Sequence, residues 1–323
     1  MTDSKYKSFI FWGMIFLFIE VVLIFSYFIF SDKKIEINNQ LAQIFTTKAS
    51  EQNNFPILKQ NQAELALSAE TYISVFAAND GHEKILTEKN KDEQLPIASI
   101  TKLMTALIAT EKYRLDDIVT ITDNSLKVDS LSGIYKPGDQ FFFYNALRAM
   151  LIASHNEVAN TLAEKTGPAS FIGSMNQKAA ELGLLNTKFI NVTGLDPEIA
   201  TGPINHSSVY DIYKLARYIS EDRPDIFYIT SQKEFDLFNI KKGFVATIKN
   251  TDKLLDGQNI PFKIIGGKTG ETDLAKQNLM IVAEAPCGGN IFSVVLGSQN
   301  RFEDMNKLLQ YINSSYDWSC SNL

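Results

Sequence analysis

Residues 71–113 read TYISVFAANDGHEKILTEKNKDEQLPIASITKLMTALIATEKY, and this stretch sets the order of the first structural elements. The β-branched and aromatic run TYISVFAA predicts a strand, NDGH supplies turn residues, and KILT predicts a returning strand. Pro96 favours an extended approach to the next element. From Ser99 the pattern changes to that of an apolar helix, SITKLMTALIATEKY.

The rest of the chain is predicted to be helical in its middle and rich in strands at its end. Strands contributed by both ends, with helices between them, indicate one sheet and an inserted helical subdomain. We therefore expect an α/β protein of the α+β type, with an antiparallel sheet built from both termini. Helical patterns cover residues 145–165, 170–184, 207–219 and 301–316, and β-rich runs cover residues 262–268, 278–285 and 291–297.

An apolar segment precedes this folded part. Phe9 to Phe30 is long enough to cross a bilayer as a helix and leads into SDKK without a small-residue cleavage site, so we expect an uncleaved anchor. Lysines flank it on both sides, so charge leaves its orientation open, and Glu20 within it has no partner that we can name. The expected organisation is a short cytoplasmic tail (1–8), a transmembrane anchor (9–30), a stalk (31–65), a catalytic domain (66–318) and a tail (319–323).

Composition excludes several classes of protein. The 323 residues are 45% hydrophobic and 21% charged, which is typical of a globular chain, and the net charge of -6 without basic runs gives no reason to bind nucleic acid. The two cysteines, Cys287 and Cys320, fit no zinc pattern, and a single disulfide between them stays open. His82, His155 and His206 show no HExxH or paired spacing. We predict no metal and no cofactor.

Three short motifs carry chemistry: Ser99-Ile-Thr-Lys102, Ser154-His-Asn156 and Lys268-Thr-Gly270. Each is weak alone, because the chain contains further copies of all three patterns. Context separates them, since the other copies precede the apolar segment, lie within or at the end of a predicted helix, or follow a strand. These copies are Ser4–Lys7, Lys165–Gly167, Ser174–Asn176 and Ser298–Asn300.

The Ser99–Lys102 spacing has a physical reason. Residues i and i+3 share one face of a helix, so the serine hydroxyl and the lysine amine can meet. Serine is a poor nucleophile until a base takes its proton, and lysine is such a base only when neutral. Apolar burial and a second cation, for which Lys268 is the candidate, both lower a lysine pKa. Ser154 can relay a proton to a leaving amine, and Asn156 can hold substrate or Lys102.

These residues belong to longer stretches that resemble a known family, the D-alanyl-D-alanine carboxypeptidases, or low-molecular-mass penicillin-binding proteins. The resemblance covers about residues 66 to 315. The stretches that carry it are Pro96–Ala106, Leu151–Asn160, Met175–Gly183, Thr187–Asp196 and Gly266–Gly270.

The resemblance implies a penicillin-recognising serine transferase/β-lactamase-like fold and an acyl-enzyme reaction on the D-Ala-D-Ala end of a peptidoglycan stem peptide. It implies that Ser99 is the nucleophile, Lys102 the base, and Ser154 and Asn156 cleft residues. It assigns Lys268, Thr269, Gly270 and Glu271 to a substrate-holding strand, with an oxyanion hole from the N–H groups of Ser99 and Glu271. Arg301 matches a family arginine that meets the substrate carboxylate, and β-lactams are the expected covalent inhibitors.

The chain departs from the family where histidine usually follows Lys-Thr-Gly, because it has Glu271 there. A carboxylate at this place can shift the pKa of Lys268 or repel an anionic substrate. Lys276 and Glu157 are further departures. The resemblance also places the catalytic domain on the extracytoplasmic side, where the substrate lies.

Other readings stay open from the sequence. A class A β-lactamase shares the three motifs, and its deacylating glutamate has one approximate counterpart in Glu181–Asn186. A D,D-endopeptidase performs the same chemistry on crosslinks. A non-catalytic wall-peptide or β-lactam sensor can keep the fold, although it has no need of an activated nucleophile.

Overall fold

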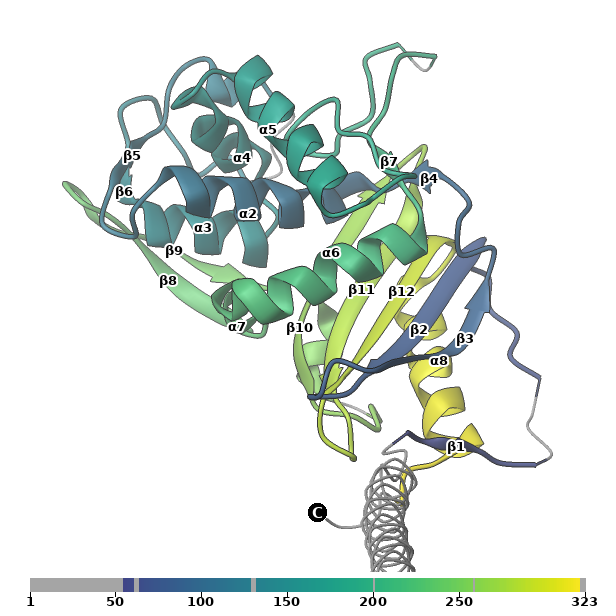
Figure 1. Ribbon diagram of the computed structural model, residues 1–323. Helices are drawn as coiled ribbons and strands as arrows, with labels where there is room; N and C mark the ends of the chain where they lie inside the picture. The colour runs from purple at the N-terminus through teal and green to yellow at the C-terminus, as the bar shows by residue number, and fades with distance from the viewer. Residues whose placement is uncertain (1–54, 61–63, 129–131, 200, 258, 320–323) are drawn as a thin grey trace, which may run out of the picture. The chain divides into compact units, whose positions relative to one another are not determined.

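A five-stranded antiparallel sheet joins the first and last parts of the described chain (Figure 1). The computed structural model describes residues 55–60, 64–128, 132–199, 201–257 and 259–319. The strand order is β10-β11-β12-β2-β3, so the first long strand pairs with the last one. The strands are β2 (Thr71–Ala77), β3 (Glu83–Lys89), β10 (Ile264–Thr272), β11 (Lys276–Glu284) and β12 (Asn290–Ser298). The predicted antiparallel sheet from both ends is confirmed.

Helices cover both faces of the sheet, which explains why all seven residues of β2 are buried. Ile73 and Val75 join the apolar core that includes α6 (Val209–Asp222). The alternate residues Tyr72 and Phe76 join the core beneath α8 (Arg301–Ser315), because successive side chains of a strand point to opposite faces. Figure 1 shows α6 and α8 on opposite faces of the sheet.

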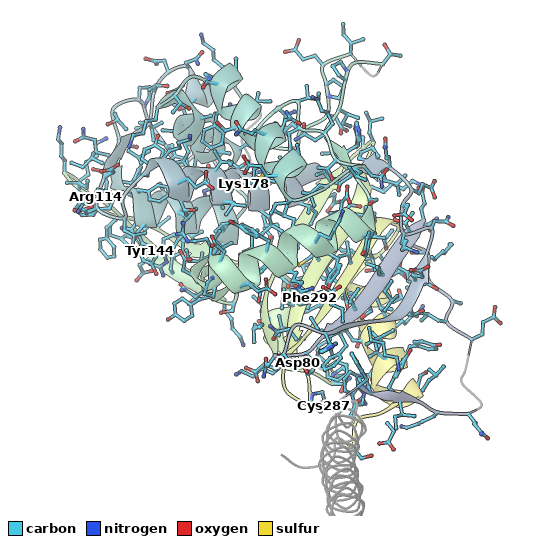
Figure 2. The ribbon with its side chains drawn as sticks, viewed as in Figure 1. Asp80, Arg114, Tyr144, Lys178, Cys287 and Phe292 are labelled. Carbon is cyan, nitrogen blue, oxygen red and sulfur yellow. The ribbon has the colours of Figure 1, made fainter. Side chains whose placement is uncertain are left out.

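One contact illustrates how α6 is fixed to the sheet. Phe292, labelled in Figure 2, projects from β12, and its ring meets that of Tyr213 on α6 edge-on, with centroids 5.5 Å apart. Both side chains are buried. Such aromatic pairs add a geometric preference to the apolar burial that holds the layers together.

Between β3 and β10 the chain forms the helical subdomain, as expected from the order of the predicted elements. Its core is apolar, and short strand pairs and 3-10 turns connect its helices. The helices are α2 (Lys102–Lys112), α3 (Phe143–Ile152), α4 (Asn156–Glu164), α5 (Pro168–Glu181) and α7 (Pro224–Thr230). The strand pairs are β4 (Leu95–Pro96) with β7 (His206–Ser207), β5 (Ile118–Thr120) with β6 (Gln140–Phe142), and β8 (Glu234–Asn239) with β9 (Gly243–Lys249). The turns are η1 (Ala98–Thr101), η2 (Ser125–Lys127) and η3 (Lys253–Asp256).

Three details differ from expectation. The helical pattern over 145–165 is two helices, α3 and α4, separated at residues 153–155. The β8–β9 hairpin was not predicted. Residues 57–58, which we expected in the stalk, form β1 (Ile57–Leu58) and pair with β13 (Tyr316–Asp317), because the Phe55 ring packs edge-on against Phe76 and holds this segment to the folded unit.

The predicted anchor, residues 9–30, lies outside the described residues. Within the part of the chain that the structure describes, no helix combines the length and apolar character needed to cross a bilayer. Cys287 is disulfide-bonded, and Cys320, the other cysteine of the chain, lies outside the described residues.

Candidate active site

The predicted nucleophile lies on a strained turn between a strand pair and a helix. Ser99 is part of η1, immediately before α2, and Ala98 beside it has a left-handed φ of +46°. Two glycines make room for this turn. A Cβ on Gly194 would lie 1.9 Å from the carbonyl oxygen of Ala98, and one on Gly270 would lie 3.2 Å from Ser99 N. The turn is therefore clamped between two backbone segments that only glycine allows so close.

The side chain of Lys102 contacts the Ser99 hydroxyl. Its Nζ lies 2.8 Å from Ser99 Oγ and donates to Asn156 Oδ1 and to the carbonyl oxygen of Thr193, both at 2.7 Å. The side chain is fully buried, and this desolvation, followed by the charge of Lys268, holds the Lys102 pKa well below its usual value.

The three contacts of Lys102 fit a neutral amine. A neutral amine has two N–H donors and one lone pair, and the two oxygens that cannot donate, Asn156 Oδ1 and Thr193 O, match the two N–H groups. The remaining neighbour, the Ser99 hydroxyl, can donate to the lone pair. The arrangement can accordingly take the proton of Ser99.

Ser154 lies in the break between α3 and α4. Its φ is +63°, an unfavourable value for a residue with a side chain, so the surrounding contacts must hold it. The next residue, His155, is buried and its Nδ1 lies 2.7 Å from the Tyr135 hydroxyl. Burial lowers the pKa of His155 to about 4 and raises that of Tyr135 well above its usual value, so the phenol donates to a neutral imidazole.

Lys268 projects from β10 toward Ser154. Its Nζ donates to Ser154 Oγ and to the carbonyl oxygen of Thr269, each at 3.0 Å, and the side chain is only 2% exposed. Burial, and after it the charge of Arg301, lower the Lys268 pKa to about 7, while the charge of Asp252 opposes the shift. Lys268 is thus able to exchange a proton near neutral pH.

An open cleft of about 990 Å³ lies above these buried lysines. Ser99, Ser154 and Asn156 are among its lining residues, and neither Lys102 nor Lys268 is, since both lie below its surface. One wall is the free edge of β10, which pairs only with β11 in its sheet. Thr269, Gly270, Glu271 and Arg301 line that wall. Arg301 Nη1 donates to the carboxylate of Glu271 at 2.7 Å.

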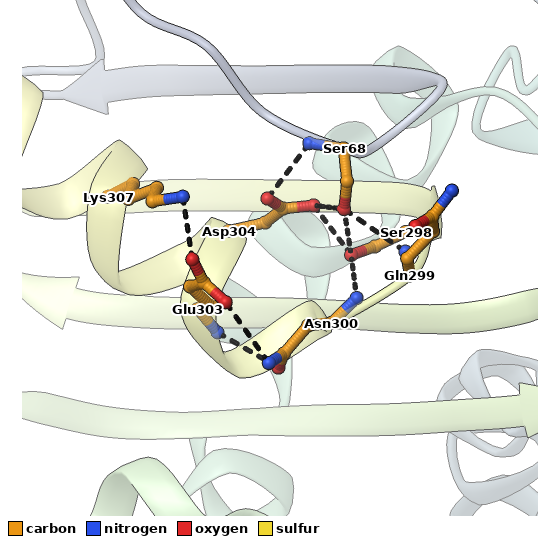
Figure 3. A network of polar contacts seen from close by, with 7 residues as sticks. All are labelled: Ser68, Ser298, Gln299, Asn300, Glu303, Asp304 and Lys307. Atoms are coloured by element: carbon orange, nitrogen blue, oxygen red, sulfur yellow. Dashed lines mark hydrogen bonds and ion pairs between the residues drawn. The ribbon is translucent and has the colours of Figure 1, made fainter.

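The structure brings together all nine predicted site residues, and it places the competing motif copies that lie within the described residues elsewhere. Ser298 and Asn300 stabilise the start of α8: Ser298 Oγ donates to Asp304 at 2.6 Å, and Asn300 Oδ1 accepts from Glu303 N (Figure 3). Ser174 and Asn176 lie within α5, where Asn176 bonds both backbone groups of Phe189. Ser4 lies outside the described residues.

The β-lactamase reading finds no deacylating carboxylate at Glu181. This side chain is half exposed, lies at the end of α5, pairs with Lys178 and does not line the cleft. In the described part of the chain, no three His, Cys, Asp or Glu side chains come together in a way that could hold a metal ion.

Several functional neighbours were not predicted. The Thr193 carbonyl that accepts from Lys102 lies within the family-like stretch Thr187–Asp196, but a backbone group leaves no trace in residue type. No sequence motif marked Tyr135 as a neighbour of the site. Thr251, whose Oγ1 lies 2.6 Å from Thr269 Oγ1, and the buried Asp252 follow the unpredicted hairpin.

Comparison with known proteins identifies a family. The family model described as D-alanyl-D-alanine carboxypeptidase matches residues 58–300. The D-alanyl-D-alanine carboxypeptidase DacC of Escherichia coli (strain K12) is 35% identical over 245 residues, which cover 71% of this chain and 58% of DacC. DacF of Bacillus subtilis (strain 168) is 30% identical and is covered over 60% of its length. The chain therefore spans about three fifths of these curated relatives.

Solved structures share the fold. Penicillin-binding protein D2 from Listeria monocytogenes, in its ampicillin-bound form, superposes with a TM-score of 0.66 at 30% identity. The match covers 78% of this chain and 100% of that chain.

Proposed function

Because this chain belongs to the D-alanyl-D-alanine carboxypeptidase family, we propose that it is a serine-type carboxypeptidase that removes the terminal D-alanine of peptidoglycan stem peptides. One observation carries the proposal: a buried, pKa-lowered Lys102 lies 2.8 Å from Ser99 Oγ at the floor of the cleft. A residue set built only to bind peptide would not need a desolvated base beside a hydroxyl.

In the first half-reaction Ser99 Oγ attacks the carbonyl carbon of the penultimate D-alanine while its proton passes to Lys102 Nζ. The N–H groups of Ser99 and Glu271 are proposed to stabilise the oxyanion. The close approach of the two segments at Gly270 supports this pairing. As the C–N bond breaks, the leaving amine takes a proton from Ser154 Oγ, which Lys268 replaces across their 3.0 Å contact.

In the second half-reaction water attacks the ester at Ser99. Before this step the proton that Lys102 took from Ser99 passes to Lys268, which restores both amines. Lys102 then accepts a proton from the attacking water and returns it to Ser99 Oγ as the C–O bond breaks, which frees the shortened peptide and restores the hydroxyl. The edge of β10 from Lys268 to Glu271 is proposed to pair with the extended peptide, and Arg301 to meet its terminal carboxylate. β-Lactams are expected to acylate the same serine, as the ampicillin-bound relative suggests.

The test is covalent labelling with a fluorescent penicillin. We expect wild-type protein and the matched control Ser174→Ala, which changes a partly exposed serine of α5, to be labelled. Ser99→Ala should stay unlabelled while folded by circular dichroism. If Ser99→Ala is labelled, or if the wild-type protein is not labelled, the proposed acyl-enzyme at Ser99 is wrong.

The product of a wall pentapeptide then separates the activities by mass spectrometry. Loss of one alanine supports the carboxypeptidase, whereas release of a crosslinked partner alone favours an endopeptidase.

We also propose that residues 9–30 anchor the protein and that the catalytic domain lies on the extracytoplasmic side. The length and apolar character of 9–30 and the location of a wall substrate support this. The stalk between them is shorter than the predicted 31–65, because residues 57–58 pair with β13 of the folded unit. An alkaline phosphatase fused after residue 60 should be active; an inactive fusion that is stably produced contradicts the topology.

A further inference from the structure

The guanidinium of Arg301 already holds a carboxylate from its own chain. Nη1 of Arg301 lies 2.7 Å from Glu271 Oε2 and 3.2 Å from the carbonyl oxygen of Gly270. Both residues line the cleft. A substrate carboxylate that uses this arginine therefore meets a donor that is occupied.

The other approach to the arginine is closed. Arg301 Nε is buried and has no hydrogen-bond partner among the described residues, so a ligand in the cleft cannot reach it from the side. A bidentate contact through the two terminal nitrogens must include Nη1, the atom that holds Glu271. If Glu271 stayed in place, two carboxylates would lie within a few ångströms of each other, which is unfavourable.

The two partners differ in how firmly they are held. The Arg301 side chain is 12% exposed, its Cζ lies 5.0 Å from the centroid of the Phe302 ring, and its backbone N donates to Gln277 Oε1 at 3.2 Å. The Glu271 side chain is 56% exposed, and among the described residues its hydrogen bond is to Arg301. Glu271 is accordingly the partner that can move away when a ligand binds.

We propose that Glu271 is a specificity-determining residue that competes with the terminal carboxylate of the substrate for Arg301. Peptides with a free C-terminal carboxylate must displace it, and their binding is weakened. Peptides whose leaving group carries a neutral amide at that position do not compete. This inference rests on the proposed function and extends it to the substrate class that the site favours.

The experiment compares one pentapeptide ending in D-Ala-D-Ala with its C-terminal carboxamide. Binding is measured by calorimetry in the Ser99→Ala background, which cannot turn over, and KM and kcat are measured with Ser99 intact. Glu271→Gln removes the charge, keeps the size and leaves the backbone N–H in place. We expect it to tighten binding of the free acid about tenfold and lower its KM, while the carboxamide changes by less than about twofold.

Two controls tie the effect to Arg301. In an Arg301→Ala background, Glu271→Gln should give no gain for the free acid. Glu70→Gln breaks an exposed ion pair with Lys276 at 2.6 Å that does not line the cleft, and it should leave both peptides unchanged.

Three results would contradict the proposed competition between Glu271 and the substrate carboxylate. They are an equal increase in affinity for both peptides, no increase for the free acid, and an increase that persists in the Arg301→Ala background. If penicillin labels the wild type and Glu271→Gln nevertheless has no effect, the inference alone fails. If penicillin labels no serine in the wild type, the proposed function fails and takes the inference with it.

Discussion

The chain contains the sequence Lys-Thr-Gly twice, and the two copies have opposite surroundings. Lys165 follows α4, its side chain is 40% exposed, and its Nζ lies 2.8 Å from an Asp117 carboxylate oxygen and 4.0 Å from the centroid of the Tyr113 ring. Gly167 then has a φ of +84°, and Pro168 begins α5. This copy ends one helix and starts the next.

Lys268 belongs instead to an edge strand and is buried. Its Nζ donates to two oxygens without formal charge, Ser154 Oγ and Thr269 O. Burial, rather than the motif, lowers its pKa to about 7. The comparison teaches that the same three residues acquire chemistry where the fold removes water from the lysine and pairs it with a hydroxyl and a carbonyl oxygen, as at Lys268, rather than with a carboxylate, as at Lys165.

The largest contrast is expected when each lysine is removed. Lys268→Ala should lower the second-order rate constant of penicillin acylation by about 10²–10⁴-fold, because it removes the proton donor to Ser154 and the cation beside Lys102. Lys165→Ala should change it by less than about twofold. Stopped-flow or gel-based labelling measures both, and similar losses in the two variants would contradict the comparison.

The glycines should separate the copies in a different way. Gly270→Ala places a Cβ 2.9 Å from the Ile97 carbonyl oxygen and 3.2 Å from Ser99 N, so it should displace the nucleophile and slow acylation by about 10–100-fold. Gly167→Ala meets nothing within 4 Å but adopts a φ that suits glycine. It should cost about 1–3 kcal/mol of unfolding free energy in urea and leave the folded protein's acylation rate unchanged. Equal acylation rates for both variants would argue against close contact between β10 and Ser99.

The smallest contrast concerns stability against pH. The pKa of Lys268 falls from 10.5 to about 7 on folding, so the unfolded chain binds more protons between these values, and this group makes stability rise with pH there. Lys268→Met should lose that slope, up to about 1.4 kcal/mol per pH unit, and gain stability relative to wild type below pH 7. Lys165→Met should keep the wild-type slope. Urea unfolding from pH 6 to 10 measures this, and parallel curves for all three proteins would refute it.

The sequence predicted those parts of the fold and site that depend on short-range pattern. The β-branched and aromatic run 71–78 predicted a strand. The i, i+3 spacing of Ser99 and Lys102 predicted their contact, which the structure places at 2.8 Å. The three motifs occur more than once in the sequence, and only the predicted secondary structure around each copy separated the site motifs from the others.

The remaining features depend on contacts between distant residues. The break at Ser154 is held by Tyr135, Lys268 and backbone packing, and no local signal marks a left-handed serine. The Thr193 carbonyl is a backbone group, and the β8–β9 hairpin gave no turn signal that we recognised. Glu271 was identified as a departure, but its pairing with Arg301 joins residues 30 positions apart and required the structure.

The pairing of β2 with β12 has a consequence for the order of folding during synthesis. Phe76 lies opposite Ile291 and Ile73 opposite Val294. More than 200 further residues must therefore be synthesised after β2 before its partner strand β12 is available. The helices of residues 102–230 emerge earlier and make local contacts, which form quickly, whereas the sheet closes last. Until then the buried strand β2, paired with β3 on one side, lacks its partner strand on the other, and the Ser99 turn lacks the β10 wall against which it packs. An acylation-competent serine is therefore a late product of folding, and a ribosome-bound chain stalled before residue 290 exposes a strand that neighbouring chains can pair with.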